Sequence, residues 1–140
     1  PPPGSVGGFG AGSAAGGDTA LYTQGFDAMK TSNYPGAIAP FQTYLSTYPQ
    51  GEMVDNAQYW LGEAYYVTRD YERAGAAFRT VGEKWPNSRK AADALVKLGF
   101  TQFELKRFAD ARVTLNDVIT RYPDTDAARL AADRLKRLPR

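Results

Sequence analysis

The stretch that decides the fold runs from residue 57 to residue 86 and reads AQYWLGEAYYVTRDYERAGAAFRTVGEKWP. In its first part the apolar residues recur at helical spacing, so that Leu61 and Tyr65 share one face of a helix. The same spacing returns in its second part. The Trp85-Pro86 pair ends this second helix, because proline cannot continue a helix and disfavours helical geometry in the residue before it. The stretch therefore predicts two consecutive helices joined by a short turn.

This pattern returns along the chain at a fixed interval of 37 residues. A period of this length indicates stacked supersecondary units that bury a common core. The matching positions are the alanines Ala20, Ala57, Ala94 and Ala131, the glycines Gly25, Gly62 and Gly99, the aromatics Tyr34, Tyr71 and Phe108, the alanines Ala37, Ala74 and Ala111, and the pairs Tyr48-Pro49, Trp85-Pro86 and Tyr122-Pro123.

The repeat predicts an all-α fold, an α-α superhelix of three helix pairs closed by a C-terminal capping helix. Its small residues allow the two helices of a pair to approach closely, and the aromatic residue in the second helix fills the space between pairs. We expect repeats at about 18–54, 55–91 and 92–125, with the capping helix over 126–138.

The first 17 residues contain seven glycines and three prolines. Such a composition buries too little surface to offset the entropy of ordering, so we expect a flexible linker over residues 1–17 and a folded domain over 18–140. We also expect Phe9 or the prolines of this tail to occupy the groove of the same or a neighbouring molecule.

Three local features carry their own expectations. Pro40 falls inside the second helix of the first unit, so that helix should begin late or bend there. Asp70 and Ser88 are placed to cap the helices that follow them.

The residues Leu61-Gly62, Tyr65, Ala74, Phe78 and Pro86 form the tetratricopeptide signature, with Gln58 at the place of its tryptophan. More closely, the stretches AQYWLGEAYYVTRDYERAGAAF, KAADALVKLGF and TLNDVITRYPDTDAARLAADRLK resemble the C-terminal domain of the YbgF/CpoB family of cell division coordinators. The resemblance covers about residues 20–138.

This resemblance implies a periplasmic protein of the Tol-Pal system. It implies that the chain binds TolA and helps to coordinate the peptidoglycan synthesis machinery with constriction of the outer membrane during division. Full-length members of the family also trimerise through an N-terminal coiled coil, which is absent from this sequence.

In a superhelix of helix pairs, the first helix of each pair lines the inner surface. Side chains that face this groove lie four and seven residues apart along each first helix. Tyrosine suits such a place, because its ring can anchor a partner while its hydroxyl tolerates water. The predicted partner-binding groove consists of Tyr22, Phe26, Met29, Asn56, Tyr59, Glu63, Tyr66, Val96, Phe100 and Phe103. Core packing remains the alternative for Phe100 and Phe103.

The composition argues against catalysis. The chain contains neither cysteine nor histidine, which excludes the common nucleophile-base pairs and leaves any metal with oxygen ligands only. We therefore expect no enzyme activity, no catalytic residue, no metal and no cofactor. No apolar run approaches the roughly 18 residues of a membrane-spanning helix, so no direct membrane insertion is expected.

The net charge of +2 conceals an asymmetry. Residues 1–68 carry one basic and five acidic side chains, whereas residues 69–140 carry sixteen basic and ten acidic ones. The basic and acidic residues are interspersed, so we do not expect nucleic acid binding. Two alternatives remain open: a scaffold of outer-membrane protein assembly, and a structural module that binds an acidic partner through Arg107 and Arg112 of the basic half.

Overall fold

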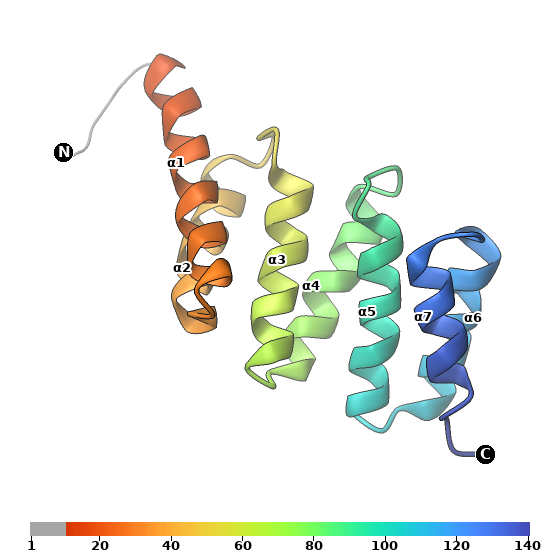
Figure 1. Ribbon diagram of the computed structural model, residues 1–140. Helices are drawn as coiled ribbons and strands as arrows, with labels where there is room; N and C mark the ends of the chain where they lie inside the picture. Colours follow the sequence, from red (N-terminus) through yellow and green to blue (C-terminus); the bar gives the residue numbers. More distant parts are fainter. Residues whose placement is uncertain (1–10) are drawn as a thin grey trace.

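Seven helices make up residues 11–140, the part of the chain that the computed structural model describes, and no strand occurs among those residues (Figure 1). The predicted all-α superhelix is confirmed: three helix pairs are followed by a single helix. In chain order the helices are α1 (Ala11–Lys30), α2 (Tyr34–Thr47), α3 (Val54–Val67), α4 (Tyr71–Lys84), α5 (Ala91–Glu104), α6 (Phe108–Arg121) and α7 (Asp126–Leu135).

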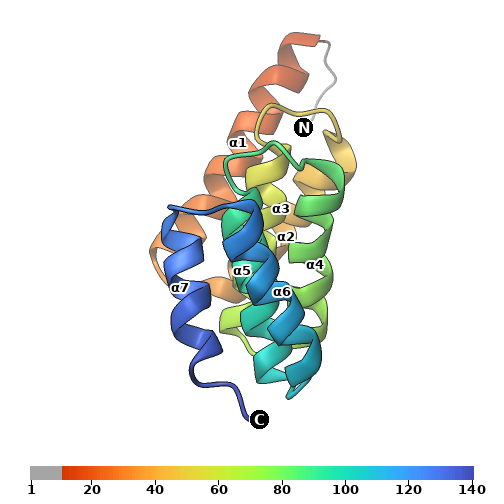
Figure 2. The same cartoon turned by 90° about the vertical axis from the view of Figure 1, so that its right-hand side faces the viewer.

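The helices form two layers (Figures 1 and 2). Each helix packs against the next in the chain, and α5 also contacts α7 as α1 contacts α3. The odd-numbered helices therefore lie side by side in one layer, with α2, α4 and α6 behind them. We call the side formed by α1, α3, α5 and α7 the inner face.

The ends of the domain differ from the predicted bounds. α1 begins at Ala11, inside the segment predicted to be a linker. Alanine favours helix at this end of α1, and extending a packed helix avoids the cost of nucleating one. At the other end α7 stops at Leu135, but Leu138 still packs into the core with 8% of its surface exposed. Phe9 lies outside the described residues, and so does its predicted place in the groove.

Pro40 does not delay the second helix. α2 begins at Tyr34, the same repeat position as Tyr71 of α4 and Phe108 of α6, and it continues through Pro40 to Thr47. Asn33 caps its start, where the side-chain Oδ1 accepts a hydrogen bond from the backbone N–H of Gly36 at 3.1 Å. The expectation of a late start was wrong.

Side-chain capping also begins two later helices. Asp70 accepts from the N–H of Arg73 at 3.5 Å, as predicted, and Thr125 accepts from the N–H of Ala128 at 3.0 Å. Ser88 does not cap α5, whose N-cap is Lys90. The hydroxyl of Ser88 instead donates to Asp55 Oδ2 at 2.5 Å and accepts from the N–H of Lys90 at 3.0 Å. Ser88 thus ties the start of α5 to the start of α3.

The turn inside each pair has a left-handed residue at a fixed repeat position. Ser32, Arg69 and Lys106 have φ angles of 62°, 65° and 62°. The residue after each one donates its N–H back into the preceding helix, as from Asp70 to Tyr65 O at 2.8 Å. This hydrogen bond satisfies a carbonyl that the end of the helix would otherwise leave unpaired.

The core depends on close approach between the two helices of each pair. A Cβ atom at Gly62 would lie 2.7 Å from Cε1 of Phe78, and one at Gly25 would lie 2.7 Å from Cε1 of Phe41. In the third pair a Cβ at Gly99 would lie 2.6 Å from Cδ2 of Leu115. Phe41, Phe78 and Leu115 are buried, so each fills the space that a glycine leaves on the facing helix.

Candidate protein-binding site

The residues of the predicted groove come from α1, α3 and α5 and divide into two classes of exposure. Tyr59, Val96 and Phe100 are buried, with 7%, 2% and 8% of their surfaces exposed. The neighbouring repeats close over these three side chains. The half-buried members, which a partner could reach, are Tyr22, Phe26, Met29, Asn56, Glu63, Tyr66 and Phe103.

Along the inner face, one pair of repeat positions makes contact at each of the three junctions between repeats. At the first junction the rings of Phe26 and Trp60 lie 5.5 Å apart, edge to face. At the second, Lys97 Nζ lies 3.0 Å from Glu63 Oε1.

At the third junction the same positions hold Phe100 and Arg134, and the guanidinium carbon lies 4.1 Å from the ring centroid. Trp60, Lys97 and Arg134 are 37 residues apart, as are Phe26, Glu63 and Phe100. One structural position thus carries an aromatic pair, an ion pair and a cation–π contact in turn.

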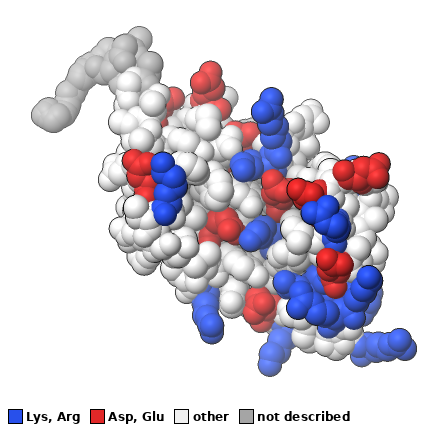
Figure 3. Space-filling view, in the orientation of Figure 1, with Lys and Arg blue, Asp and Glu red and all other residues white. Residues whose placement is uncertain are grey.

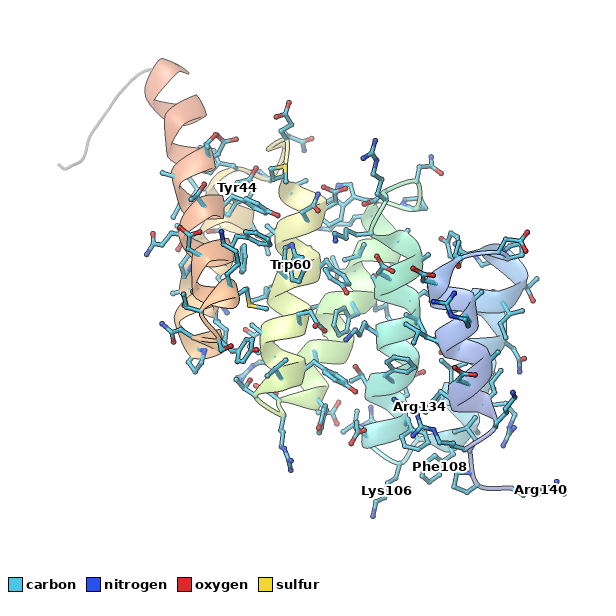
Figure 4. The ribbon with its side chains drawn as sticks, in the orientation of Figure 1. Tyr44, Trp60, Lys106, Phe108, Arg134 and Arg140 are labelled. Atoms are coloured by element: carbon cyan, nitrogen blue, oxygen red, sulfur yellow. The ribbon has the colours of Figure 1, made fainter. Side chains whose placement is uncertain are left out.

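The first junction leaves an open hollow between α1 and α3 of about 260 Å³. Tyr22 stacks on Phe26 beside it, with ring centroids 6.0 Å apart. Figure 4 shows Trp60 reaching from α3 toward α1. Aromatic side chains with polar groups at the rim are common at sites that bind an apolar side chain of a partner. The hollow is lined by Phe26, Met29, Lys30, Tyr34, Trp60, Glu63 and Val67.

Basic side chains lie over the aromatic rings of this face. Lys90 Nζ is 4.9 Å from the ring centroid of Tyr59 and 4.8 Å from that of Trp60. Lys97 Nζ, besides its ion pair, lies 5.0 Å from the ring of Tyr66. Such contacts are electrostatically favourable because a ring presents negative charge on its face.

At the α5–α7 end the guanidinium of Arg134 covers two rings, those of Phe100 and, at 4.8 Å, Phe103. Phe103 in turn packs edge to face on Phe108 at 5.5 Å. Figure 4 shows Arg134 and Phe108 near the lower end of the molecule. The third junction is therefore covered, whereas the first is open.

Burial changes the acidity of the tyrosines on this face. It raises the pKa of Tyr59 well above the ordinary value, and the nearby carboxylates of Glu63 and Asp93 raise it further. Burial likewise raises the pKa of Tyr22 and Tyr66. These hydroxyls therefore stay protonated at neutral pH and can donate hydrogen bonds.

The chain matches a known protein family along almost its whole length. A family model described as outer membrane lipoprotein, YfiO, matches residues 14–139. The chain belongs to the YfiO family. Among residues 11–140, no helix is both long and apolar enough to cross a membrane.

A curated relative is the cell division coordinator CpoB of Pseudomonas putida strain KT2440. It is 36% identical over a stretch that covers 44% of this chain. The match spans 25% of that protein's own length. The predicted resemblance to CpoB is confirmed, and the matched stretch of this YfiO-family chain corresponds to about a quarter of the length of that relative.

Solved tetratricopeptide domains share the fold of this YfiO-family chain. The domain of Arabidopsis OM64 superposes with a TM-score of 0.73 at 14% identity, over 89% of this chain and 98% of that one. The TPR2B domain of yeast Sti1, in complex with pHsp70, gives a TM-score of 0.73 at 17% identity, over 86% and 94% of the two chains. At these identities the likeness establishes the fold alone.

Four residues that shape the inner face are missing from the predicted groove: Trp60, Lys90, Lys97 and Arg134. A signal for three of them was present in the YfiO-family sequence, because Trp60, Lys97 and Arg134 share one repeat position. Lys90 lies in the loop before α5, where the periodicity of the helices gives no guidance.

Proposed function

We propose that this chain is a scaffold that binds a segment of another protein along its inner face. The binding surface consists of the half-buried side chains around the hollow, with Phe26 and Trp60 at its centre and Tyr22 and Met29 beside them. We propose a role in binding and not in catalysis, because aromatic and apolar side chains make up most of the lining of the hollow.

One observation carries this proposal: at the first junction the rings of Phe26 and Trp60 pack against the core on one side and line an open hollow on the other. The equivalent rings at the third junction are covered by Arg134, and the second junction is closed by the ion pair of Glu63 and Lys97. The hollow is large enough for one apolar side chain. Aromatic anchors in such places contribute much of the free energy of protein association.

We further propose that the chain works in the periplasm as part of the Tol-Pal system, with TolA as its partner. In this role it would help to coordinate peptidoglycan synthesis with constriction of the outer membrane during division. The similarity to the cell division coordinator CpoB supports this assignment. We also propose that the full-length protein trimerises through a coiled coil outside this sequence.

Calorimetric titration of the chain with a periplasmic fragment of TolA tests this function. We expect Trp60→Ala to weaken binding by at least about tenfold, since truncating an aromatic anchor removes about 2 kcal/mol or more. The matched control is Val113→Ala, which shortens an apolar side chain that is 71% exposed on α6. Equal affinities for Trp60→Ala and the wild type would contradict binding at the inner face.

A second candidate function is scaffolding of outer-membrane protein assembly. The match to the family described as outer membrane lipoprotein favours it. Pull-down from envelope extracts, with wild type and Trp60→Ala compared, distinguishes the two roles. Trp60-dependent capture of assembly components without TolA would favour the second.

The remaining alternative places binding on the basic half of the chain. Arg107 forms an ion pair with Glu72 at 2.6 Å, and Arg112 donates to the carbonyl of Pro139 at 3.0 Å. If binding to the TolA fragment is lost on neutralising both arginines and kept in Trp60→Ala, the partner binds there and not at the inner face.

A further inference from the structure

The two ends of the helical array are closed by side chains of different charge. At the first end no repeat precedes α1, and its side chains Gln24 and Asp27 are exposed. The matching residues of the second repeat, Leu61 and Ala64, are buried in the core. A neutral and an acidic side chain are therefore enough to keep an uncovered repeat edge in water.

At the other end α7 has no second helix to pair with, and its uncovered side is basic. Lys136 occupies the repeat position of Gly62 and Gly99, which face the second helix of their own pairs. Lys136 is exposed, and so are Arg137 and Arg140. Closing the array requires polar residues and not cations in particular, so the positive charge at this end needs another explanation.

Two further cations lie at the same end. Arg112 of α6 donates to the carbonyl of Pro139 at 3.0 Å, which places its guanidinium against the C-terminal segment. Figure 4 shows Lys106, in the turn before α6, at the end of the molecule where Arg140 lies. Figure 3 shows basic side chains gathered over this end. We call this set the basic edge: Lys106, Arg112, Lys136, Arg137 and Arg140.

The cations of the basic edge are free to meet an external anion. All five side chains are exposed, and among residues 11–140 none of the five forms an ion pair with a carboxylate. Residues 133–140 hold one acidic and four basic side chains, so carboxylates of the same segment do not balance the positive charge. The buried side chain of Leu138 fixes this segment to the core and so holds its cations at the surface.

We propose that the basic edge binds an anionic membrane surface. The cations lie against the phosphate groups of acidic phospholipids, and no part of the chain inserts into the bilayer. This inference goes beyond the proposed function, because it assigns a second surface and does not depend on which protein the inner face binds.

Two features favour a lipid surface. Clusters of about four to eight lysines and arginines bind acidic headgroups through long flexible side chains, without a shaped pocket. The charge of the whole chain also has the required direction: residues 1–68 carry four more acidic than basic side chains, and residues 69–140 carry six more basic than acidic ones. A molecule with this separation of charge approaches a negative surface with its basic end first.

Binding through the basic edge is compatible with binding at the inner face. The hollow beside Trp60 lies between α1 and α3, at the opposite end of the array from α7 (Figure 1). A molecule that stands on the membrane with its α7 end therefore keeps this hollow in water and accessible to a protein segment.

A nucleic acid offers the same phosphate charge but is the less suitable partner. Single strands are usually held by exposed aromatic rings on which their bases stack. Phe108 lies at this end of the molecule in Figure 4, but it is half-buried and packs edge to face on Phe103 at 5.5 Å. Its ring is therefore engaged within the fold.

Sedimentation with lipid vesicles tests the proposal. We expect the chain to bind vesicles of phosphatidylcholine with about 30% phosphatidylglycerol at least about tenfold more tightly than vesicles of phosphatidylcholine alone, at about 50 mM salt. At about 500 mM salt the difference should disappear, because the charges are then screened. Equal binding to both vesicles at low salt, or no binding to either, would overturn the proposal.

Two triple variants of equal net charge separate the basic edge from the charge of the whole chain. Lys136→Gln with Arg137→Gln and Arg140→Gln should weaken binding to the acidic vesicles by at least about tenfold. The control variant changes Arg79, Lys84 and Arg89 to Gln, three exposed cations on α4 and in the loop that follows it. If the control variant loses as much affinity, the basic edge is not the binding site.

A further double variant keeps the test decisive if the first one folds poorly. Lys106→Gln with Arg112→Gln removes the two cations of the basic edge that lie outside α7 and its C-terminal segment. It should weaken vesicle binding by about tenfold, and circular dichroism checks its fold. Unchanged binding in this folded variant would exclude the α6 side from the site and contradict the basic edge as defined.

The orientation on the membrane is tested by energy transfer from a dye on the chain to a dye on the lipid. The chain contains no cysteine, so a single label can be placed at Ala132→Cys on α7 or at Gln24→Cys on α1. We expect the stronger transfer from the label on α7. Equal transfer from both positions would contradict binding by the basic edge.

A single-stranded oligonucleotide serves as the competing anion. If it binds the chain as tightly as the acidic vesicles do, and loses affinity in the same triple variant, the basic edge is a general polyanion site and the membrane proposal is wrong. Binding of the TolA fragment to the triple variant is measured in parallel. Unchanged affinity there, together with lost vesicle binding, would support two separate surfaces.

Discussion

The first helices of the three repeats present two sides, and the repeats treat these sides differently. Toward α2, α4 and α6, every repeat makes the same contact, a glycine backbone against a large apolar side chain. Toward the inner face, one position pair changes from Phe26 with Trp60 to Glu63 with Lys97 and then to Phe100 with Arg134. The stacking of repeats requires the same residue types on the side that faces α2, α4 and α6. It places no such requirement on the inner face, so the residues that determine function are expected on the inner face.

The largest effect is expected when the constant side is disturbed. Gly62→Leu would place a side chain where Cε1 of Phe78 lies 2.7 Å from the first added carbon. We expect the free energy of unfolding to fall by about 3 kcal/mol, since an overpacked core must shift its backbone. Urea denaturation followed by circular dichroism measures the loss.

Gly82 of α4 provides the matched control, because a Cβ at that position meets no atom within 4 Å. Gly82→Ala should leave stability unchanged or raise it by up to about 1 kcal/mol, since alanine is the better helix former. If Gly62→Leu costs no more than Gly82→Ala, close approach at the glycine is not what fixes this side.

A smaller effect is expected for the ion pair on the variable side. The side chains of Glu63 and Lys97 are only 17% and 24% exposed, so Glu63→Gln leaves a half-buried ammonium without its partner. We expect a loss of about 1–2 kcal/mol. A double-mutant cycle with Lys97→Gln should show that the two losses are not additive.

The exposed pair of Arg129 and Asp126, with side chains 69% and 82% exposed, serves as the reference for this cycle. Its coupling should stay below about 0.5 kcal/mol. Equal coupling in both pairs would mean that burial at the second junction adds nothing.

Tyr59 belongs to the predicted groove but is buried between the two sides, and this predicts a dependence on pH. Burial raises the pKa of Tyr59 in the folded chain above its unfolded value near 10. As the pH rises past 10 the unfolded chain loses this proton first, so stability is full below that pH and falls above it. The loss should reach about 1 kcal/mol at pH 11. Denaturation curves at pH 8 and pH 11 should differ less for Tyr59→Phe than for the wild type; an unchanged difference would contradict the assignment.

The smallest effect is expected in the turns, which belong to neither side. Arg69 adopts a left-handed conformation with φ of 65°, which is unfavourable for any residue with a side chain. Arg69→Gly should therefore raise the free energy of unfolding by about 0.5 kcal/mol, after the greater flexibility of glycine in the unfolded chain is subtracted. Thermal denaturation measures it, and a lowered melting temperature would show that the Arg69 side chain stabilises the turn.

The constant side could be predicted from the sequence, whereas the variable side could be predicted only in part. Gly62 and Phe78 recur at a fixed spacing, and that spacing alone places them on facing helices. On the inner face, the helices that contribute could be predicted from the same period. The partner of each side chain could not, because Phe26 meets Trp60 on the next repeat, and that match depends on how far each pair is rotated against its neighbour.

The exposure of individual side chains could not be predicted from the sequence either. Tyr22, Tyr59 and Val96 occupy the same repeat position, but Tyr59 is buried and Tyr22 is half-buried. The difference arises because Tyr59 has a repeat on either side and Lys90 above it, while Tyr22 belongs to the first repeat. Position within the array, and not residue type, decides the exposure.

The contacts on the inner face differ from one junction to the next, and this limits how the array could be lengthened. A copy of residues 55–91, inserted after residue 91, would pack against the existing core as residues 55–91 do, because the glycine contact is the same in every repeat. Yet Glu63 would then face the copied tryptophan, and only the carboxylate of the copy would reach Lys97. The core would accept repeats in any number, but the inner face specifies their order.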